Sequence, residues 1–359
     1  MLKFFRKIRY DFMVKNKTGK PAFAAGRYFK YAIGEIVLVV IGILIALSLN
    51  NWNEKMNQGA NFDKLIDALE NEIIENIDEA NYEIKWYRVT QLNASKILTN
   101  KISRKQFLEE RNLRSLIELN RLDINSDDVS SMVNKQEDFP ENYKVLIPHL
   151  KNYLKFEKRY NKNQLDYGKQ ITEYDNFLIK TQPWYASSNA KVLDSIALNK
   201  QVDFYLENPI YKNFLSSYIY GYSYSLREMV GIRSASLVIL AEIKRVRENF
   251  DADDVKKLFS QYNISPYTEQ ACDDSKVSTN DFNDPSTYLP LMNATNQTKN
   301  IQWEDYENNL VKKIQLKPGE LTVNPVSKRM HENALIKIFI NGECTMKYQA
   351  KTNGYLLIQ

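Results

Sequence analysis

The chain has 359 residues, 43% of them hydrophobic and 26% charged, and a net charge of +5. Residues 1–31 carry nine basic side chains and one acid, a net charge of +8, so the remainder of the chain carries a net charge of −3. The basic charge therefore lies in a tail rather than on a folded surface, and this argues against nucleic-acid binding. A length of about 310 residues after the apolar segment described next is sufficient for two domains with their own cores.

One segment is apolar and long enough to cross a bilayer. Residues 32–52 read AIGEIVLVVIGILIALSLNNW, and only Glu35 interrupts the run. As a helix, the stretch from Ala32 to Leu49 spans about 27 Å, close to a hydrocarbon core of about 30 Å. Glu35 lies within one turn of the end, where its carboxylate reaches the headgroups, and Trp52 suits the opposite interface. The segment is predicted to be a transmembrane helix.

The basic tail sets the expected orientation of this helix. By the positive-inside rule residues 1–31 lie in the cytoplasm and everything after Trp52 lies outside, which is the periplasm in a Gram-negative cell. A cleaved signal peptide is the competing interpretation, but the basic region is long and no small-x-small cleavage site follows Leu49. Gly42 and Ala46 form a small-xxx-small pair that either packs two anchors together or simply faces lipid.

Residues 53–262 are predicted to form an extracytoplasmic antiparallel helical bundle, because apolar side chains recur every three or four positions. The expected helices cover residues 60–99, 104–135 as one or two pieces, 143–178 starting near Pro140, 189–204 and 210–249. The first of them has no proline or glycine and can continue the anchor outward as a stalk. Asp127 is expected to cap a following helix. Tyr218, Tyr220, Tyr222 and Tyr224 are interpreted as a belt between helices, with sugar or peptide binding as the alternative.

Residues 263–285 are predicted to be a linker, since proline, aspartate, asparagine, serine and threonine accumulate there. Its aspartates lack the spacing, glycine and closing glutamate of a calcium loop. Residues 286–359 alternate apolar and polar side chains, with turns at Lys317-Pro318-Gly319 and Asn341-Gly342, and predict a small antiparallel β-sandwich of five to seven strands. Cys272 and Cys344 either form one disulfide or remain two separate thiols. The fold class is therefore a membrane-anchored α+β protein.

The N-terminal signature GEIVLVVIGILIALSLNNWNE, after a basic MLKFFRKIR start, resembles a family of uncharacterised single-pass membrane proteins common in Bacteroidetes-type bacteria. The resemblance is specific from the start of the chain through residue 54, and it is diffuse from there to about residue 250. The resemblance implies a single-pass membrane topology, but it implies no activity.

The C-terminal stretch resembles the β domain of the von Hippel–Lindau protein over roughly residues 286–359. The elements that carry the resemblance are an Asn-x-Thr start, Trp303, the acidic-Tyr-x-Asn turn after it and Leu316-Lys317-Pro318-Gly319. In that relative the sandwich binds a hydroxyproline-containing peptide, so the resemblance implies peptide binding here.

Carried over by position, the peptide pocket retains Trp303, Ser327 and His331. Lys313 stands where the family has a tyrosine and Asn333 where it has a second tryptophan, so the ligand is implied less strongly than the fold. The alternative is that Trp303 belongs to the core and that His331 is an ordinary surface residue.

The sequence motifs give no support for a catalytic function. His149 and His331 are the two histidines, neither lies in a metal or triad motif, and no phosphate-binding glycine loop is present. No Glu-x-x-His pair supports a carboxylate metal site. We therefore expect a non-enzymatic protein with no metal or cofactor, whose sandwich binds a protein or peptide in the cell envelope and which can associate with itself through the anchor or stalk. The alternative is a small-molecule sensor acting through the bundle and a separate membrane partner, because the tail before the apolar segment is too short for an output domain.

Overall fold

The computed structural model describes residues 24–110, 113, 116–118, 124–189, 194–272, 286–304, 310–324, 330–331, 334–340 and 343–359. Contacts divide the chain at Lys64 into two compact units, Met1–Lys64 and Leu65–Gln359. Helix α2 runs from Ala24 to Leu98 and contributes residues to both units. The predicted stalk thus belongs to the same helix as the predicted anchor, a continuity that the sequence left open because Gly59 lies between them.

The first unit contains the apolar segment. Within α2, Ile33–Asn53 has a mean hydropathy of 2.4 and none of it is buried, and Gly42 has no heavy atom of another element near it. It is long and apolar enough to cross a membrane, although a signal sequence passes the same test.

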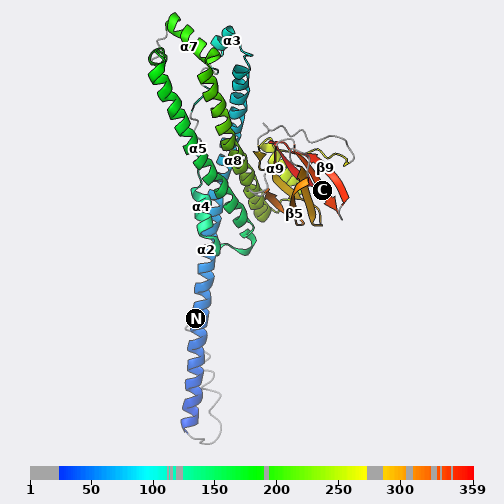
Figure 1. Cartoon of the computed structure of the whole chain (residues 1–359). Helices are drawn as coiled ribbons and strands as arrows, with labels where there is room; N and C mark the ends of the chain where they lie inside the picture. Colours follow the sequence, from blue (N-terminus) through cyan, green and yellow to red (C-terminus); the bar gives the residue numbers. More distant parts are fainter. Residues whose placement is uncertain are drawn as a thin grey trace. The chain divides into compact units, whose positions relative to one another are not determined.

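The second unit is built on two long helices, α5 (Leu146–Thr181) and α8 (Pro209–Glu248), with the outer half of α2 (Figure 1). Helix α8 begins where Asn208 accepts hydrogen bonds from the amides of Ile210 and Tyr211 and Pro209 takes the first turn, and it ends at Asn249 in the left-handed region at φ 58°. The shorter helices are α3 (Arg104–Glu109), α4 (Asp127–Asn134), α6 (Tyr185–Asn189), α7 (Ser195–Glu207) and α9 (Ala252–Gln261).

Three predicted helix boundaries were wrong. The helix expected over residues 189–204 is α7, which begins at Ser195, where the Asp194 side chain accepts the Ala197 amide and caps it. Helix α5 begins at Leu146 rather than near Pro140, because two 3₁₀ turns, η2 (Gln136–Asp138) and η3 (Glu141–Tyr143), occupy the preceding residues. Asp127 does not cap α4 but is its first residue. The carboxylate of Glu72, from α2, accepts the amides of Asp128 and Val129 at 2.9 and 3.0 Å and so supplies the cap from another helix.

The four tyrosines of α8 lie on a helix, as the flanking apolar spacing indicated. Tyr218 and Tyr222 are buried and pack on Tyr167 of α5 at centroid distances of 4.9 and 5.3 Å, the first pair tilted and the second stacked. Tyr220 and Tyr224 are exposed and share a hydrogen bond of 2.7 Å. The belt is therefore split, with one pair inside the helix interface and one pair on the surface.

Within the described residues, the strands form two four-stranded sheets and one two-stranded sheet, with the orders β1-β10-β3-β6, β5-β4-β8-β9 and β2-β7. The strand bounds are β1 Ser265–Pro266, β2 Ser286–Thr287, β3 Pro290–Asn293, β4 Lys299–Glu304, β5 Leu310–Leu316, β6 Leu321–Val323, β7 Met330–His331, β8 Leu335–Ile340, β9 Glu343–Gln349 and β10 Gly354–Ile358.

Side chains of both large sheets share one hydrophobic cluster, which includes Leu291, Leu356, Ile301, Trp303 and Ile336. The sheet of β5, β4, β8 and β9 is antiparallel as predicted, but β10 pairs in parallel with β1 and β3. A purely antiparallel arrangement was therefore wrong, and β1 lies inside the segment predicted to be a linker.

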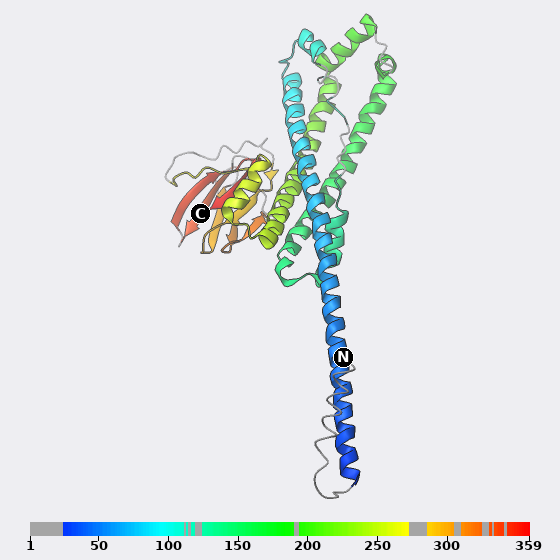
Figure 2. The ribbon, with the colours of Figure 1, turned by 180° about the vertical axis from the view of Figure 1, so that it is seen from behind.

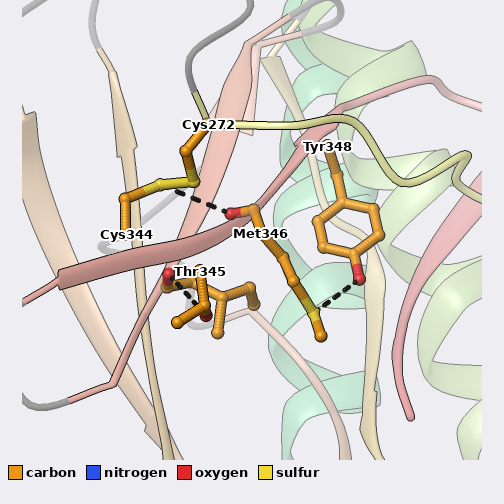
Figure 3. The surroundings of a disulfide bond; sticks show 6 residues. Cys272, Cys344, Thr345, Met346 and Tyr348 are labelled. Carbon is orange, nitrogen blue, oxygen red and sulfur yellow. Dashed lines mark hydrogen bonds between the residues drawn. A yellow bond between two sulfur atoms is a disulfide. The ribbon is translucent and has the colours of Figure 1, made fainter.

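The segment before the strands is joined to the sheet by a disulfide between Cys272 and Cys344 of β9, whose Cα atoms are 6.1 Å apart (Figure 3). Beside it, backbone hydrogen bonds of 2.8 and 3.2 Å join Gln270 and Lys347. The predicted turn at Asn341-Gly342 lies outside the described residues.

Helix α8 is buried throughout residues 228–243 because helices and strands both cover it (Figure 2). On the strand side, the Ser234 hydroxyl donates to the carbonyl of Tyr288 at 2.6 Å. Arg233 is 2% exposed and donates to the side chains of Asn81 and Asn353 and to the Thr352 carbonyl, so it joins α2, α8 and the turn before β10. The strands and helices of this unit thus share buried contacts.

Gly231 of α8 packs closely against Phe156 of α5. A Cβ atom built there meets the ring of Phe156 at 2.6 Å, and Phe156 in turn packs on Tyr288 at a centroid distance of 4.6 Å. We expect Gly231→Ala to lower the free energy of unfolding by about 1 to 2 kcal/mol, because overpacking outweighs the gain in helix propensity of about 1 kcal/mol.

The matched control is Gly221→Ala in the same helix, where the added Cβ meets the flexible end of Gln170 at 3.3 Å. That variant should be neutral or more stable in urea denaturation. Equal effects of the two substitutions would show that Gly231 is not a packing contact.

Candidate functional site

A cleft lies where the helices meet the strands, and we call it the junction cleft. It has a volume of about 750 Å³. Three segments line it: the start of α5, the end of α8 with the residues after it, and the turn between β5 and β6. The lining residues are Val145, Pro148, His149, Glu242, Arg245, Val246, Asn249, Phe250 and Lys317 to Thr322.

The turn that forms one wall of the junction cleft is the Lys317-Pro318-Gly319 sequence. Gly319 has φ 69°, a value that glycine adopts without strain, and the Glu320 amide donates to the Lys317 carbonyl at 3.1 Å. The Lys317 amide donates to the Glu320 carboxylate at 2.8 Å. The predicted turn is confirmed, and its backbone is rigidly held.

A buried asparagine supports this turn from behind. Asn293 is fully buried, and its side-chain nitrogen donates to the carbonyls of Gln297, Leu316 and Lys317 at 2.8 to 3.1 Å. Its side-chain oxygen accepts the amide and hydroxyl of Thr295. The Asn-x-Thr sequence and the Lys-Pro-Gly turn, singled out separately in the sequence, thus form one hydrogen-bonded structure.

Arg245 connects the helical wall to the turn. Its guanidinium donates to Glu242 at 2.8 Å and to the Gly319 carbonyl at 3.0 Å. The Glu242 side chain is 5% exposed, and burial raises the pKa of its carboxyl while Arg245 opposes the shift. The charge of Glu242 is therefore matched by Arg245 within the wall of the cleft.

His149 adds a neutral polar group. It is 7% exposed, and burial lowers the pKa of its imidazole to about 4, so the ring is uncharged at neutral pH. Apolar surface from Val145, Pro148, Phe250 and Leu321 surrounds these groups. A mainly apolar cleft with a few fixed polar groups, within the usual range of about 300–1,000 Å³, suits an apolar side chain or small ligand.

The buried His149 predicts a loss of stability in acid. Its pKa is lower in the folded chain than the ordinary value of 6.5, so the unfolded chain binds the proton first as the pH falls below 6.5. We expect about 2 kcal/mol of unfolding free energy to be lost through this group between pH 7 and pH 5. His149→Gln should have a flatter pH profile in urea denaturation over that interval. Parallel profiles of the two proteins would contradict the assignment.

The three residues of the predicted peptide pocket are placed only in part. Trp303 lies on β4 in the shared core and is 3% exposed, so it does not offer an open aromatic wall. Ser327 and Asn333 lie outside the described residues, and of His331 only the backbone, in β7, is described. Lys313 is exposed on β5 opposite Gln302. The pocket stays a prediction.

Sequence reasoning did not find the junction cleft, because its walls come from three segments that lie far apart in the chain and show no shared motif. The Lys-Pro-Gly turn was the available signal. Among the described residues, no group of three or more histidine, cysteine, aspartate or glutamate side chains is placed to hold a metal ion.

Comparison with models of known protein families, with curated proteins and with solved structures gives no match to this chain.

Proposed function

We propose that the chain is a single-pass membrane protein that binds a protein or peptide partner on the outer side of the membrane, and that the junction cleft receives an apolar side chain of that partner. The cleft is the observation that supports this proposal. It combines apolar walls with the hydrogen-bonded Lys317-Pro318-Gly319 turn and with the buried Glu242 carboxylate, which Arg245 pairs. No catalytic step is required of these groups.

The topology is part of the proposal. Residues 1–31 carry a net charge of +8 and precede the apolar segment, which favours a cytoplasmic N-terminus. The disulfide of Cys272 and Cys344 supports an oxidising compartment for the strands, such as the periplasm. In intact spheroplasts, external protease should digest residues 65–359 and leave the tail protected. Digestion of the tail instead would reverse the orientation.

Binding at the junction cleft is tested by substitutions on its rim. Val145 is 40% exposed and Lys317 is exposed, so Val145→Glu and Lys317→Glu change the cleft without opening a core. Leu165→Glu on α5, at a leucine that is 67% exposed and does not line the cleft, is the matched control. Partners crosslinked in intact cells should be lost with both rim variants and kept with the control.

A deletion of residues 286–359 is a poorer test, because the buried contacts of Arg233 and Ser234 would be lost with the strands. If the rim variants still crosslinked the same partners, the partner would bind outside the junction cleft. If His331→Ala then removed the partner, the pocket implied by the family resemblance would be the site. Trp303→Ala is unsuitable because that ring is in the core.

A further inference from the structure

A groove of about 360 Å³ lies on the outer half of α2, within the second unit. Its floor is a row of side chains spaced three or four positions apart, so they share one face of the helix. They are Tyr82, Trp86, Val89, Thr90 and Asn93. The helix rises about 16 Å from Tyr82 to Asn93, which is long enough for a small molecule to lie along the row.

Residues beyond α2 line the second wall of the groove and hold its shape. They are Leu116, which is 3% exposed, and Glu118. The Tyr218 hydroxyl of α8 donates to the Glu118 carbonyl at 3.0 Å. On the floor, the ring of Trp86 meets Tyr222 edge-on at a centroid distance of 6.2 Å. The groove is therefore preformed, and a ligand does not have to order its walls.

The end of the groove near Asn93 is deep and polar. Thr90 and Asn93 are 3% and 8% exposed, and their side chains have no hydrogen-bond partner among the described residues. Thr172 and Thr181 of α5 each donate to the carbonyl four positions earlier, at 2.9 and 2.7 Å, whereas Thr90 makes no such bond to Trp86. Buried polar groups are normally hydrogen-bonded, so this hydroxyl and amide are suited to bonding a ligand in the groove.

The other end of the groove is open and aromatic. Tyr82 is 60% exposed and Trp86 is half-buried, and they lie about one helical turn apart. Sugar binding was the alternative for the tyrosines of α8, but Tyr218 and Tyr222 are buried between helices. The rings of α2 are open to a ligand and lie beside unbonded polar groups. Aromatic faces of this kind pack against the C–H bonds of a sugar ring.

The rim of the groove is polar and carries no net charge. Lys85 and Glu118 are both exposed and line the groove, one of each sign. The ammonium group only donates hydrogen bonds and the carboxylate only accepts them, whereas Thr90 and Asn93 do both. Sugar hydroxyls also donate and accept, so they match this set of groups. A cation or an anion would be attracted by one rim residue and repelled by the other.

We propose that this groove binds a neutral sugar, whose ring packs on Tyr82 and Trp86 and whose hydroxyls bond to Thr90 and Asn93. The volume is near the lower end of the range of about 300–1,000 Å³ for small-molecule sites, which suits a monosaccharide or disaccharide unit. A free sugar and the end of a glycan chain offer the same chemistry. The groove shares no lining residue with the junction cleft, so the two proposals can fail separately.

The test is saturation-transfer difference NMR on the full chain in lipid nanodiscs, because many detergents carry a sugar headgroup. The probes are glucose, N-acetylglucosamine, the linked trimer of N-acetylglucosamine and, as a peptide, tri-alanine. A sugar should bind, with the protons of one ring face saturated most strongly. Tighter binding of the trimer than of its monomer would identify the ligand as a glycan chain, and equal binding would identify it as a free sugar.

Two variants of the groove should weaken the binding of that sugar. Asn93→Leu should weaken it about tenfold through the lost hydrogen bonds, and its urea midpoint should not fall because no bond to a described residue is broken. Tyr82→Ala should weaken it about fivefold through the lost ring contact. Tyr220→Ala is the matched control and should bind normally, because this tyrosine of α8 is 67% exposed and does not line the groove.

The proposal is overturned if no sugar receives saturation, or if Asn93→Leu and Tyr82→Ala both bind as the wild type does. Stronger saturation of tri-alanine than of any sugar, lost in the same variants, would also overturn it and would identify a peptide groove. If Asn93→Leu does not fold, Tyr82→Ala decides by itself, because that side chain lies on the surface.

Discussion

Replacing Cys272 and Cys344 together by serine is expected to lower the free energy of unfolding by about 4 kcal/mol. The two cysteines are 72 positions apart, so loss of the disulfide returns a large amount of chain entropy to the unfolded state. The described part of the preceding segment is otherwise held by the short β1 pairing, by the bridge at Gln270 and by Tyr267, which packs in the core and donates to the Lys351 carbonyl. Urea denaturation monitored by tryptophan fluorescence measures the change.

The control for this prediction is the wild-type chain with a reducing agent, which should unfold at the same urea concentration as the double variant. Single serine variants should match them both. If reduction lowered stability much more than the double substitution did, reductant would be acting on something other than this bond, and an unchanged midpoint in all cases would contradict the prediction.

Arg233→Ala is expected to cost about 3 to 4 kcal/mol of stability, because removing a buried charged partner leaves its acceptors unsatisfied. The guanidinium holds Asn81, Asn353 and the Thr352 carbonyl, and the last of these lies in a residue that is 3% exposed. The loss should loosen the turn before β10, so amides of Gly354–Ile358 should lose protection in hydrogen exchange.

Arg159→Ala on the exposed face of α5 is the matched control and should change stability by less than about 0.5 kcal/mol. Arg233→Lys separates charge from geometry, since a lysine cannot span the three acceptors in the same plane. Full stability of Arg233→Ala would mean that water replaces the guanidinium at this junction.

Local signals in the sequence were sufficient for the long helices. The apolar spacing between Leu65 and Ile84, the Asn208-Pro209 start of α8 and the Lys317-Pro318-Gly319 turn act within a few residues, so pattern and propensity determine them. The apolar span from Ile33 to Asn53 was equally clear from composition.

Features that depend on residues far apart in the chain could not be predicted from local sequence patterns. The Glu72 cap of α4 bonds to amides 56 and 57 positions further along the chain, and no local pattern reports such a bond. The parallel pairing of β10 arises from tertiary packing, whereas alternation of apolar and polar residues reports only that a strand has one buried face. The junction cleft is of the same kind, since it forms only after α5, α8 and the β5–β6 turn have met.

The central place of β10 has a consequence for biosynthesis. It follows β1, β3 and β6 in the chain, yet it lies between β1 and β3 in the finished sheet. While the chain is synthesised, β1 and β3 therefore emerge before the strand that joins them, and the face of α8 that contacts the strands is not yet covered. Folding of this unit must finish after synthesis of Gly354–Ile358, and until then its exposed apolar surface is prone to aggregation and to chaperone binding.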